Sequence, residues 1–297
     1  MVSKTLDLQI RRLSLIGDNS IANLITHGQK LLQIGSDSAK LDTEILLSFV
    51  LDKDRSFLLT WPEKKLNDTQ LHDFFQLLIR RIQGEPIAYI VGVKEFWSLP
   101  LWVSKATLIP RPDTETLVES VLEHYSGRKN INCLDLGTGT GAIALALASE
   151  NPTWKIDAVD FSMDAVELAQ RNAKKCQLAH VNIFQSDWFS QIENNKQYDL
   201  IVSNPPYIDG NDKNLTEGDV RFEPASALIA TDNGLADIKH IANIARNFLT
   251  AHGQLFFEHG FEQGDDVRSI LENLGFLAPQ TKQDLNGHDR ITWATFS

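Results

Sequence analysis

The sequence predicts an α/β protein in which a mostly parallel sheet is covered by helices and preceded by a small helical bundle. Residues 1–85 show helical periodicity and no strand signature. Residues 86–112 are rich in Val, Ile, Trp and Pro, and residues 113–297 alternate strand and helix. Such alternation produces a parallel sheet with helices on its faces, because each pair of parallel strands needs a crossover connection.

Length and composition exclude several other classes of protein. The chain has 297 residues, 42% of them hydrophobic, which rules out a disordered or fibrous protein. Its 28 basic and 39 acidic residues give a net charge of −11. This charge disfavours binding of nucleic acid or anionic membranes over the whole surface, so that only binding through a local basic patch remains possible.

The chain also lacks the marks of a secreted or membrane protein. No run approaches ~18 consecutive apolar residues, and the N-terminus has no apolar signal-peptide core. The two cysteines, Cys133 and Cys176, cannot form a disulfide framework in a chain of this size. We therefore expect a cytoplasmic monomer with no membrane partner and no direct nucleic-acid partner.

The N-terminal bundle is predicted from two amphipathic segments. Residues 38–54 place apolar side chains on one stripe at the helical period, and residues 66–84 do so after a cap at Asp68 or Thr69. Residues 1–85 carry no chemical motif. We interpret them as a partner-recognition domain.

Residues 86–112 are predicted to form a β-hairpin linker or short strands between two domains, with turn residues at Gly92 and at Ser98-Leu99-Pro100. The aromatic side chains Phe96, Trp97 and Trp102 could serve as a stacking platform for bases. Few basic residues lie among them, so we favour packing at the domain junction.

Strands and helices are predicted to alternate throughout residues 113–297. We expect helices at 114–125, 141–150, 162–176, 234–249 and 261–275. We expect strands at 131–137, 154–160, 181–187, 198–206 and 253–260, with two more around the turn Asn286-Gly287. The last pair is expected to be antiparallel at one edge of the sheet.

Ligands in a doubly wound sheet bind beyond the carboxyl ends of the strands, so the residues there are the first candidates. The first strand is followed by the glycine-rich turn Gly137, Thr138, Gly139, Thr140, Gly141. Its glycines allow close approach of the backbone to a ligand, with helix N-terminal amides behind them. No Gly-Lys-Ser/Thr follows, which excludes a P-loop, but nicotinamide and flavin enzymes use similar turns.

The next two strand ends carry acidic and aromatic side chains. The second strand ends in Asp160, whose carboxylate can accept hydrogen bonds from both ribose hydroxyls of a nucleoside cofactor or can simply cap the next helix. The third ends in Asp187 and Trp188, which suit an adenine amine and its flat face. Together they predict an adenosine-containing cofactor, with NAD and S-adenosylmethionine both open.

The fourth strand ends in Asn204-Pro205-Pro206-Tyr207, which decides between the two cofactors. The prolines keep the backbone extended and carry no amide hydrogen. The Asn204 side-chain oxygen and the Pro205 carbonyl can accept both hydrogens of an NH2 group, and Tyr207 can sandwich a planar amide or base. An amide nitrogen is a weak nucleophile because its lone pair is delocalised, and acceptors that pull its hydrogens out of plane localise that lone pair toward a methyl donor. We predict that Asn204, Pro205 and Tyr207 are catalytic and that all four residues of the segment bind the substrate. The alternative is that the segment is only a structural turn.

These stretches resemble the peptide chain release factor glutamine methyltransferases, the PrmC/HemK family. The resemblance runs from about residue 38 to the C-terminus, and IPRPDTE (109–115) and RFEP (221–224) are more specific than NPPY (204–207). No candidate site position departs from the family pattern. Residues 1–20 look like an extension beyond the usual start and receive no role.

The resemblance implies a Rossmann-like class I S-adenosylmethionine-dependent methyltransferase domain with an N-terminal helical bundle and a hairpin linker. It implies methyl transfer, with S-adenosylhomocysteine as product, to the glutamine amide of the Gly-Gly-Gln motif in bacterial class 1 release factors, which act in translation termination. On this sequence, the resemblance implies that Gly137 to Gly141 and Asp160 hold the methionine and ribose parts of S-adenosylmethionine. It also implies that Trp188 borders the adenine and that Asn204 touches both cofactor and substrate. The charged residues Arg111, Glu115, Arg221 and Glu223 order the rim of the site or form purely structural ion pairs.

Other functions are weighed against this one. The alternative function is a methyltransferase for an exocyclic amine of a DNA or RNA base, which would use the same residues, Asn204 to Tyr207, as a clamp around a flipped base. A non-catalytic module that binds the cofactor is the other class. The eight histidines show no metal spacing, and no Gly-x-Ser-x-Gly elbow supports a hydrolase. The polar segment 209–232 is too long for an ordinary connection, and we expect it to close over the substrate.

Overall fold

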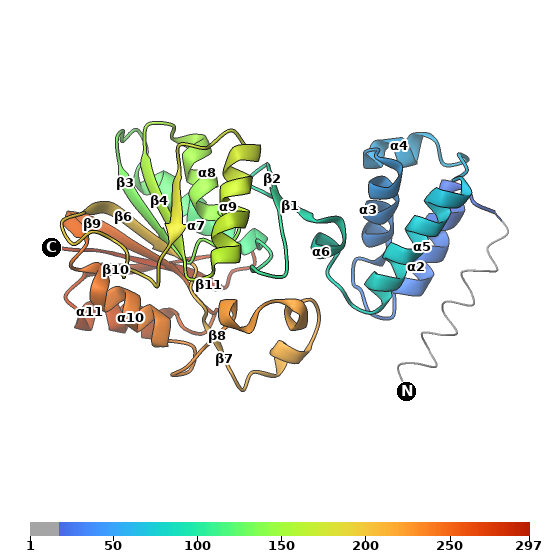
Figure 1. Ribbon diagram of the computed structural model, residues 1–297. Helices are drawn as coiled ribbons and strands as arrows, with labels where there is room; N and C mark the ends of the chain where they lie inside the picture. Colours follow the sequence, from blue (N-terminus) through green and yellow to red (C-terminus); the bar gives the residue numbers. More distant parts are fainter. Residues whose placement is uncertain (1–17) are drawn as a thin grey trace. The chain divides into compact units, whose positions relative to one another are not determined.

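The computed structural model describes residues 18–297, which divide into two compact units (Figure 1). The first unit comprises the described residues up to Gly92 together with Thr216–Phe222, and the second comprises Val93–Leu215 and Glu223–Ser297. Most of the predicted extension at 1–20 lies outside the described residues.

The first unit is helical, as the sequence predicts. Its described helices are α2 (Ile21–Leu32), α3 (Ala39–Leu51), α4 (Arg55–Thr60), α5 (Asp68–Ile82) and α6 (Ile87–Val91). Their apolar stripes meet in one core that includes Leu24, Leu46, Leu47, Phe74 and Leu78, each almost fully buried.

Two local predictions in this unit are wrong. The cap of α5 is Asn67, not Asp68 or Thr69: its side chain accepts from the Gln70 backbone N–H at 2.9 Å, and the Gln70 side chain accepts from the Asn67 N–H at 3.1 Å. The start of the linker forms the short helix α6, because Pro86 precedes its first turn and burial of Ile90 in the helical core outweighs the strand preference of its β-branched residues.

A short part of the polar segment 209–232 belongs to the first unit. Arg81 of α5 is almost buried and bonds two carboxylates, with its Nε 2.8 Å from Asp42 and one guanidinium nitrogen 2.9 Å from Asp219. The segment is more ordered than its composition suggests. It contains η2 (Lys213–Thr216), η3 (Val220–Phe222), η4 (Ala225–Ala227) and β8 (Ile229–Ala230), which pairs with β7 (Ile208–Asp209).

The second unit is built on a twisted sheet with strand order β10-β11-β9-β6-β3-β4-β5 (Figure 1). The strands are β3 (Asn132–Leu136), β4 (Lys155–Asp160), β5 (Asn182–Gln185), β6 (Tyr198–Ser203), β9 (Leu249–Glu258), β10 (Leu277–Gln283) and β11 (Asp289–Thr295). All neighbours from β9 to β5 pair in parallel, and β11 pairs antiparallel with β9 and β10. The predicted α/β fold and its antiparallel edge are confirmed.

Helices cover both faces of this sheet (Figure 1). Their bounds are α7 (Glu115–His124), α8 (Ala142–Glu150), α9 (Met163–Lys175), α10 (Ala236–Ala245) and α11 (Gly264–Asn273). Successive residues of β6 point to opposite faces. Leu200 and Val202 join the core under α7, α8 and α9, and Ile201 joins the core under α10 and α11.

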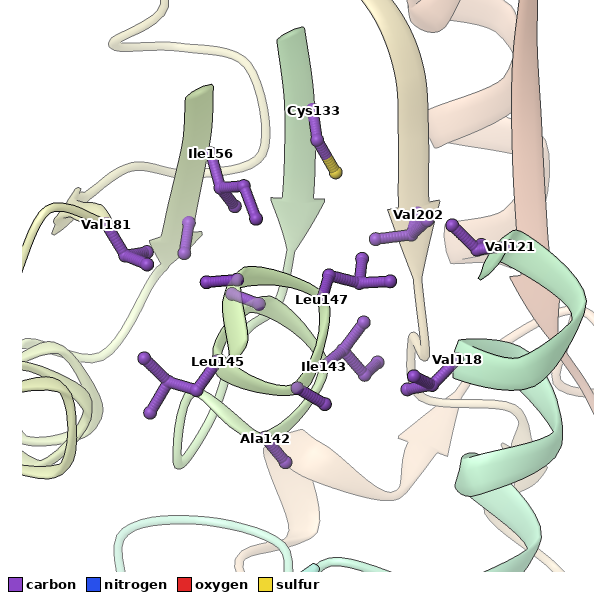
Figure 2. Packing of buried hydrophobic residues seen from close by; sticks show 14 of the residues in the cluster. Val118, Val121, Cys133, Ala142, Ile143, Leu145, Leu147, Ile156, Val181 and Val202 are labelled. Carbon is purple, nitrogen blue, oxygen red and sulfur yellow. The ribbon is translucent and has the colours of Figure 1, made fainter. Parts of the chain in front are cut away.

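Helix α8 is apolar all round, because it is enclosed on every side. Figure 2 shows Leu147 and Ile143 of α8 among Cys133, Val202 and Val118 from the strands and α7. This enclosure fixes the N-terminus of α8, and with it the glycine-rich turn, at the carboxyl end of β3.

The hairpin β1 (Val93–Phe96) and β2 (Leu99–Trp102) packs within the second unit. Phe96 is buried in its core, and the Trp102 ring is covered by Arg171 and Lys175 at 4.9 and 4.7 Å from the ring centroid. The Asn172 side chain of α9 accepts from the Trp102 N–H at 2.7 Å and donates to the Trp102 carbonyl and to the Thr140 carbonyl, both at 2.9 Å. One buried amide thus links the hairpin to the glycine-rich turn.

Candidate active site

The carboxyl ends of β3, β4, β5 and β6 surround a cavity of about 280 Å³ in the second unit. The structure brings most of the predicted site residues to its wall, namely Gly137, Thr138, Gly139, Thr140, Asp160, Asp187, Trp188, Asn204 and Pro206. Gly141, Pro205 and Tyr207 do not line it: Gly141 caps α8, and the other two lie directly beside lining residues.

The glycine-rich turn has the backbone geometry that its glycines permit. Gly137, Gly139 and Gly141 have φ angles of 72°, 55° and 85°, in the left-handed region that side chains with a Cβ rarely adopt. Thr138 donates to the buried Asp135 carboxylate at 2.6 Å, and burial raises the Asp135 pKa to about 7. The turn is therefore anchored to the buried Asp135, and residues Gly137 to Thr140 of the turn line the cavity.

Asp160 lies at the end of β4 against this turn. One carboxylate oxygen accepts from the Gly139 N–H and the other from the Ser162 N–H, both at 2.9 Å. Ser162, not Asp160, caps α9. The helix-cap alternative therefore does not account for Asp160, which retains lone pairs toward the cavity, as a pair of ribose hydroxyls would need.

Trp188 follows β5 in a left-handed conformation, with φ of 46°. The Ser186 hydroxyl donates to the Trp188 carbonyl at 2.7 Å and supports that conformation. A Cβ placed on Gly137 would lie 3.5 Å from the indole, so the ring sits directly over the glycine-rich turn. Asp187 lines the same part of the cavity, as does Asp237 of α10, which sequence reasoning missed.

The Asn204-Pro205-Pro206-Tyr207 segment leaves the sheet at the end of β6. The Asn204 side-chain nitrogen donates to the Thr114 hydroxyl at 3.3 Å, so the amide oxygen is the end that remains to accept. The Tyr207 hydroxyl donates to Glu258 at 3.3 Å, and the Tyr207 carbonyl accepts from the Gln263 side chain at 3.1 Å. The segment is thus held by hydrogen bonds at both ends.

Glu258 is a site-proximal residue that sequence reasoning did not select. It ends β9, whose Phe257 pairs in parallel with Ser203 of β6, so Asn204 and Glu258 follow at the same level of the sheet. Its only sequence signal was an acidic residue after an apolar strand, and the adjacency of β9 and β6 is not encoded locally.

Burial raises the pKa of Glu258 to about 7. Hydrogen bonds from Thr114 and Tyr207 and the positive charge of Arg290 on β11 act in the opposite direction, and Asp113 adds to the increase. Burial also raises the pKa of the Tyr207 phenol, so that group stays protonated and donates.

The charged residues expected at the rim do not form one network. Arg111 pairs with the buried Glu223 at 2.5 Å, while Glu115 accepts from the Trp97 backbone N–H at 2.9 Å and so holds the hairpin. Arg221 belongs to the first unit, where its guanidinium lies 5.0 Å from the centre of the Phe222 ring.

Within residues 18–297, no group of three His, Cys, Asp or Glu side chains is placed to hold a metal ion. No helix in that part of the chain has the length and apolar character needed to cross a bilayer.

The sheet order, the glycine-rich turn after β3 and the acidic end of β4 define a class I methyltransferase domain. A family model described as a methyltransferase small domain matches residues 112–235, and one described as a PrmC N-terminal domain matches residues 23–92. The 16S rRNA methyltransferase of T. thermophilus, solved with AdoMet and guanosine, is 20% identical, covers 69% of this chain and 50% of its own, and has a TM-score of 0.51. At this identity, the similarity shows the fold alone.

Relatives of known name identify the family. The release factor glutamine methyltransferase of Aliivibrio fischeri is 55% identical over 264 residues, which cover 89% of this chain and 93% of that protein. The protein of the same name from Escherichia coli K12 is 52% identical over 257 residues, with 86% and 92% covered. The chain belongs to the release factor glutamine methyltransferase family.

Proposed function

We propose that this protein transfers a methyl group from S-adenosylmethionine to the side-chain amide nitrogen of the glutamine in the Gly-Gly-Gln motif of class 1 release factors. The observation that carries the proposal is the orientation of Asn204 at the cavity wall. Its amide nitrogen is engaged by Thr114, which leaves its oxygen as an acceptor beside two prolines that have no N–H. Such a site accepts hydrogens from an NH2 group.

The cavity fits an adenosine-containing cofactor. The left-handed glycines allow a ligand to approach the backbone, Asp160 retains acceptor capacity, and Asp187 and Trp188 suit an adenine amine and ring. S-adenosylmethionine supplies an electrophilic methyl group when it is bound. Gly137 to Gly141, Asp160, Asp187, Trp188 and Asn204 are the residues that we propose to hold it.

The segment Asn204 to Tyr207 acts as a clamp that makes the glutamine amide nitrogen, a poor nucleophile, reactive mainly by positioning it. Acceptors at Asn204 and Pro205 draw the two amide hydrogens out of the amide plane, and the nitrogen lone pair then localises. Tyr207, held through its hydroxyl and its carbonyl, limits how the glutamine can tilt. The proton leaves the nitrogen after the new bond forms, so no general base is needed at the start.

The remaining parts of the proposal concern partners. We propose that residues 1–85 recognise the release factor and that residues 86–112 link this domain to the methyltransferase domain at 113–297. We also propose that the protein acts as a monomer in the cytoplasm and does not bind nucleic acid directly.

We further propose that the segment 209–232 closes over the substrate. Closure predicts slower proteolysis of this segment when cofactor and release factor are both present, and an unchanged rate would refute it.

The test is a competition between substrates. The purified protein is incubated with cofactor labelled in its methyl group, together with a class 1 release factor and ribosomal RNA. The proposal predicts label in the release factor alone. Label confined to the RNA would overturn it in favour of a base amine, and label in neither would favour a module that only binds the cofactor.

A further inference from the structure

The connection between β9 and α11 bonds the aromatic residue of the clamp at two points. Glu258, at the end of β9, accepts from the Tyr207 hydroxyl at 3.3 Å. Gln263, directly before α11, donates from its side-chain nitrogen to the Tyr207 carbonyl at 3.1 Å. The side chain and the backbone of Tyr207 are therefore both tied to this one connection.

The backbone of Gly260 fixes which end of the Gln263 side-chain amide faces Tyr207. The Gly260 N–H donates to the Gln263 side-chain oxygen at 2.8 Å, and the Gln263 N–H donates to the Gly260 carbonyl at 2.9 Å. A backbone N–H can only donate, so the side-chain atom that faces Gly260 must be the oxygen. The NH2 group then faces the Tyr207 carbonyl, which can only accept. The orientation of the amide is thus set by partners whose roles cannot be exchanged.

The Gln263 NH2 group bridges two carbonyls from distant parts of the chain. It donates to Tyr207 at 3.1 Å and to Asn233 at 3.0 Å, so both of its hydrogens have an acceptor. These two residues lie just before and just after the polar segment 209–232. The backbone on either side of that segment is therefore joined at one point.

The peptide group between Tyr207 and Ile208 is bonded on both sides. Its N–H, carried by Ile208, donates to the Leu228 carbonyl at 2.9 Å as part of the pairing of β7 with β8. Its carbonyl accepts from Gln263. A peptide group held at both its N–H and its carbonyl has little freedom to rotate, which restricts the direction in which the Tyr207 side chain leaves the backbone.

We propose that Gln263 is a positioning residue, whose NH2 group fixes Tyr207 before the substrate binds, so that the glutamine amide enters a preformed clamp. The inference rests on the proposed function, because it concerns how that amide is oriented. Gln263 is not among the residues that line the cavity, so it acts through Tyr207 and not on the reacting atoms. Its effect is on the turnover of the bound complex and not on cofactor affinity.

Two substitutions separate this role from a purely structural one. Gln263→Glu keeps the volume and the oxygen that accepts from Gly260, but it replaces the donor with an oxygen that faces two carbonyls. Gln263→Met removes the interactions on both sides. If Gln263 only secured the start of α11, glutamate would be the better replacement, since it keeps the bond to Gly260 and an acidic side chain suits a helix N-terminus. If Gln263 positions Tyr207, glutamate is no better than methionine in turnover.

Gln170→Glu is the matched control. Gln170 of α9 also donates its side-chain amide to a backbone carbonyl, that of Ile183 at 2.9 Å, and it does not line the cavity. Each variant is assayed at about pH 8, where a glutamate side chain is ionised. Methyl transfer to release factor gives kcat and KM, titration gives cofactor affinity, and chemical denaturation gives stability.

We expect Gln263→Glu to lower kcat at least about tenfold, an amount typical of one lost hydrogen bond, and to retain the KM for release factor and the cofactor affinity. Its stability should be at least that of Gln263→Met, and Gln170→Glu should keep the wild-type kcat. A wild-type kcat in Gln263→Glu, a kcat above that of Gln263→Met, or a fall in cofactor affinity as large as the fall in kcat would overturn the proposal.

Gln263→Met decides the question if Gln263→Glu does not fold. It adds no charge and also lacks the donor, so a lowered kcat with retained cofactor affinity is expected, and a wild-type kcat would overturn the proposal. If the wild-type protein does not methylate the release factor at all, the proposed function itself has failed. The two failures are therefore distinguishable.

Discussion

Replacement of Gly234 by alanine tests whether the clamp is held as rigidly as the structure indicates. Gly234 has a φ of 81°, and a Cβ there would lie 2.1 Å from the Tyr207 carbonyl oxygen and 2.8 Å from the Gln263 side-chain nitrogen. The left-handed conformation alone costs an alanine about 1–2 kcal/mol. Relief of the clash requires the Tyr207 carbonyl to move by roughly 1 Å, and a displacement of that size is expected to lower kcat/KM about 100-fold.

The matched control is Gly275→Ala, where φ is 85° but nothing lies within 4 Å of the added Cβ. Both variants are assayed for methyl transfer to release factor, for cofactor affinity by titration, and for stability by chemical denaturation. We expect both to lose the stability that backbone strain costs, and only Gly234→Ala to lose turnover. Equal activity of the two variants would refute the account of a rigidly held clamp.

Three further predictions concern the same site. Asn204→Ala should cut turnover at least about 100-fold while the fold persists, and near-normal turnover in steady-state assays would refute the nitrogen clamp. The Glu258 carboxylate accepts a hydrogen bond from the Tyr207 hydroxyl at 3.3 Å, and burial raises the pKa of Glu258 to about 7, so activity should fall as pH drops through about 7. That limb should be missing from the pH profile of Glu258→Gln, and an identical profile would contradict the assignment. Asn172→Leu leaves the Trp102 N–H and carbonyl and the Thr140 carbonyl unpaired, so the free energy of unfolding should fall by about 3 kcal/mol or more, and a loss under 1 kcal/mol by denaturant titration would refute this link.

The sequence predicted those parts of the fold and site that are encoded locally. The glycine-rich turn, Asp160 and the Asn204-Pro205-Pro206-Tyr207 segment each follow a strand directly. In a parallel sheet, strand ends gather at one edge, so these residues could be placed together without knowing the strand order. Their roles toward cofactor and substrate remain predictions.

The parts that were missed depend on contacts between distant segments. Glu258 and Thr114 come together with Asn204 only because β9 lies beside β6 and the segment before α7 packs over both strand ends. Helix α6 was mistaken for a strand because β-branched residues favour strands, and tertiary burial overrode that preference. The predicted cap of α5, Asp68 or Thr69, lies one or two residues beyond the observed cap, Asn67, which is the usual uncertainty at helix ends.

The central claim is most directly tested by locating the added methyl group on the release factor. The purified protein is incubated with release factor and S-adenosylmethionine, and the modified peptide is fragmented in a mass spectrometer. The account predicts one methyl group on the side-chain amide of the Gly-Gly-Gln glutamine, and an at least about 100-fold slower appearance of that group when Asn204→Ala replaces the wild type. A methyl group on any other residue, or an unmodified glutamine after complete cofactor turnover, would contradict it.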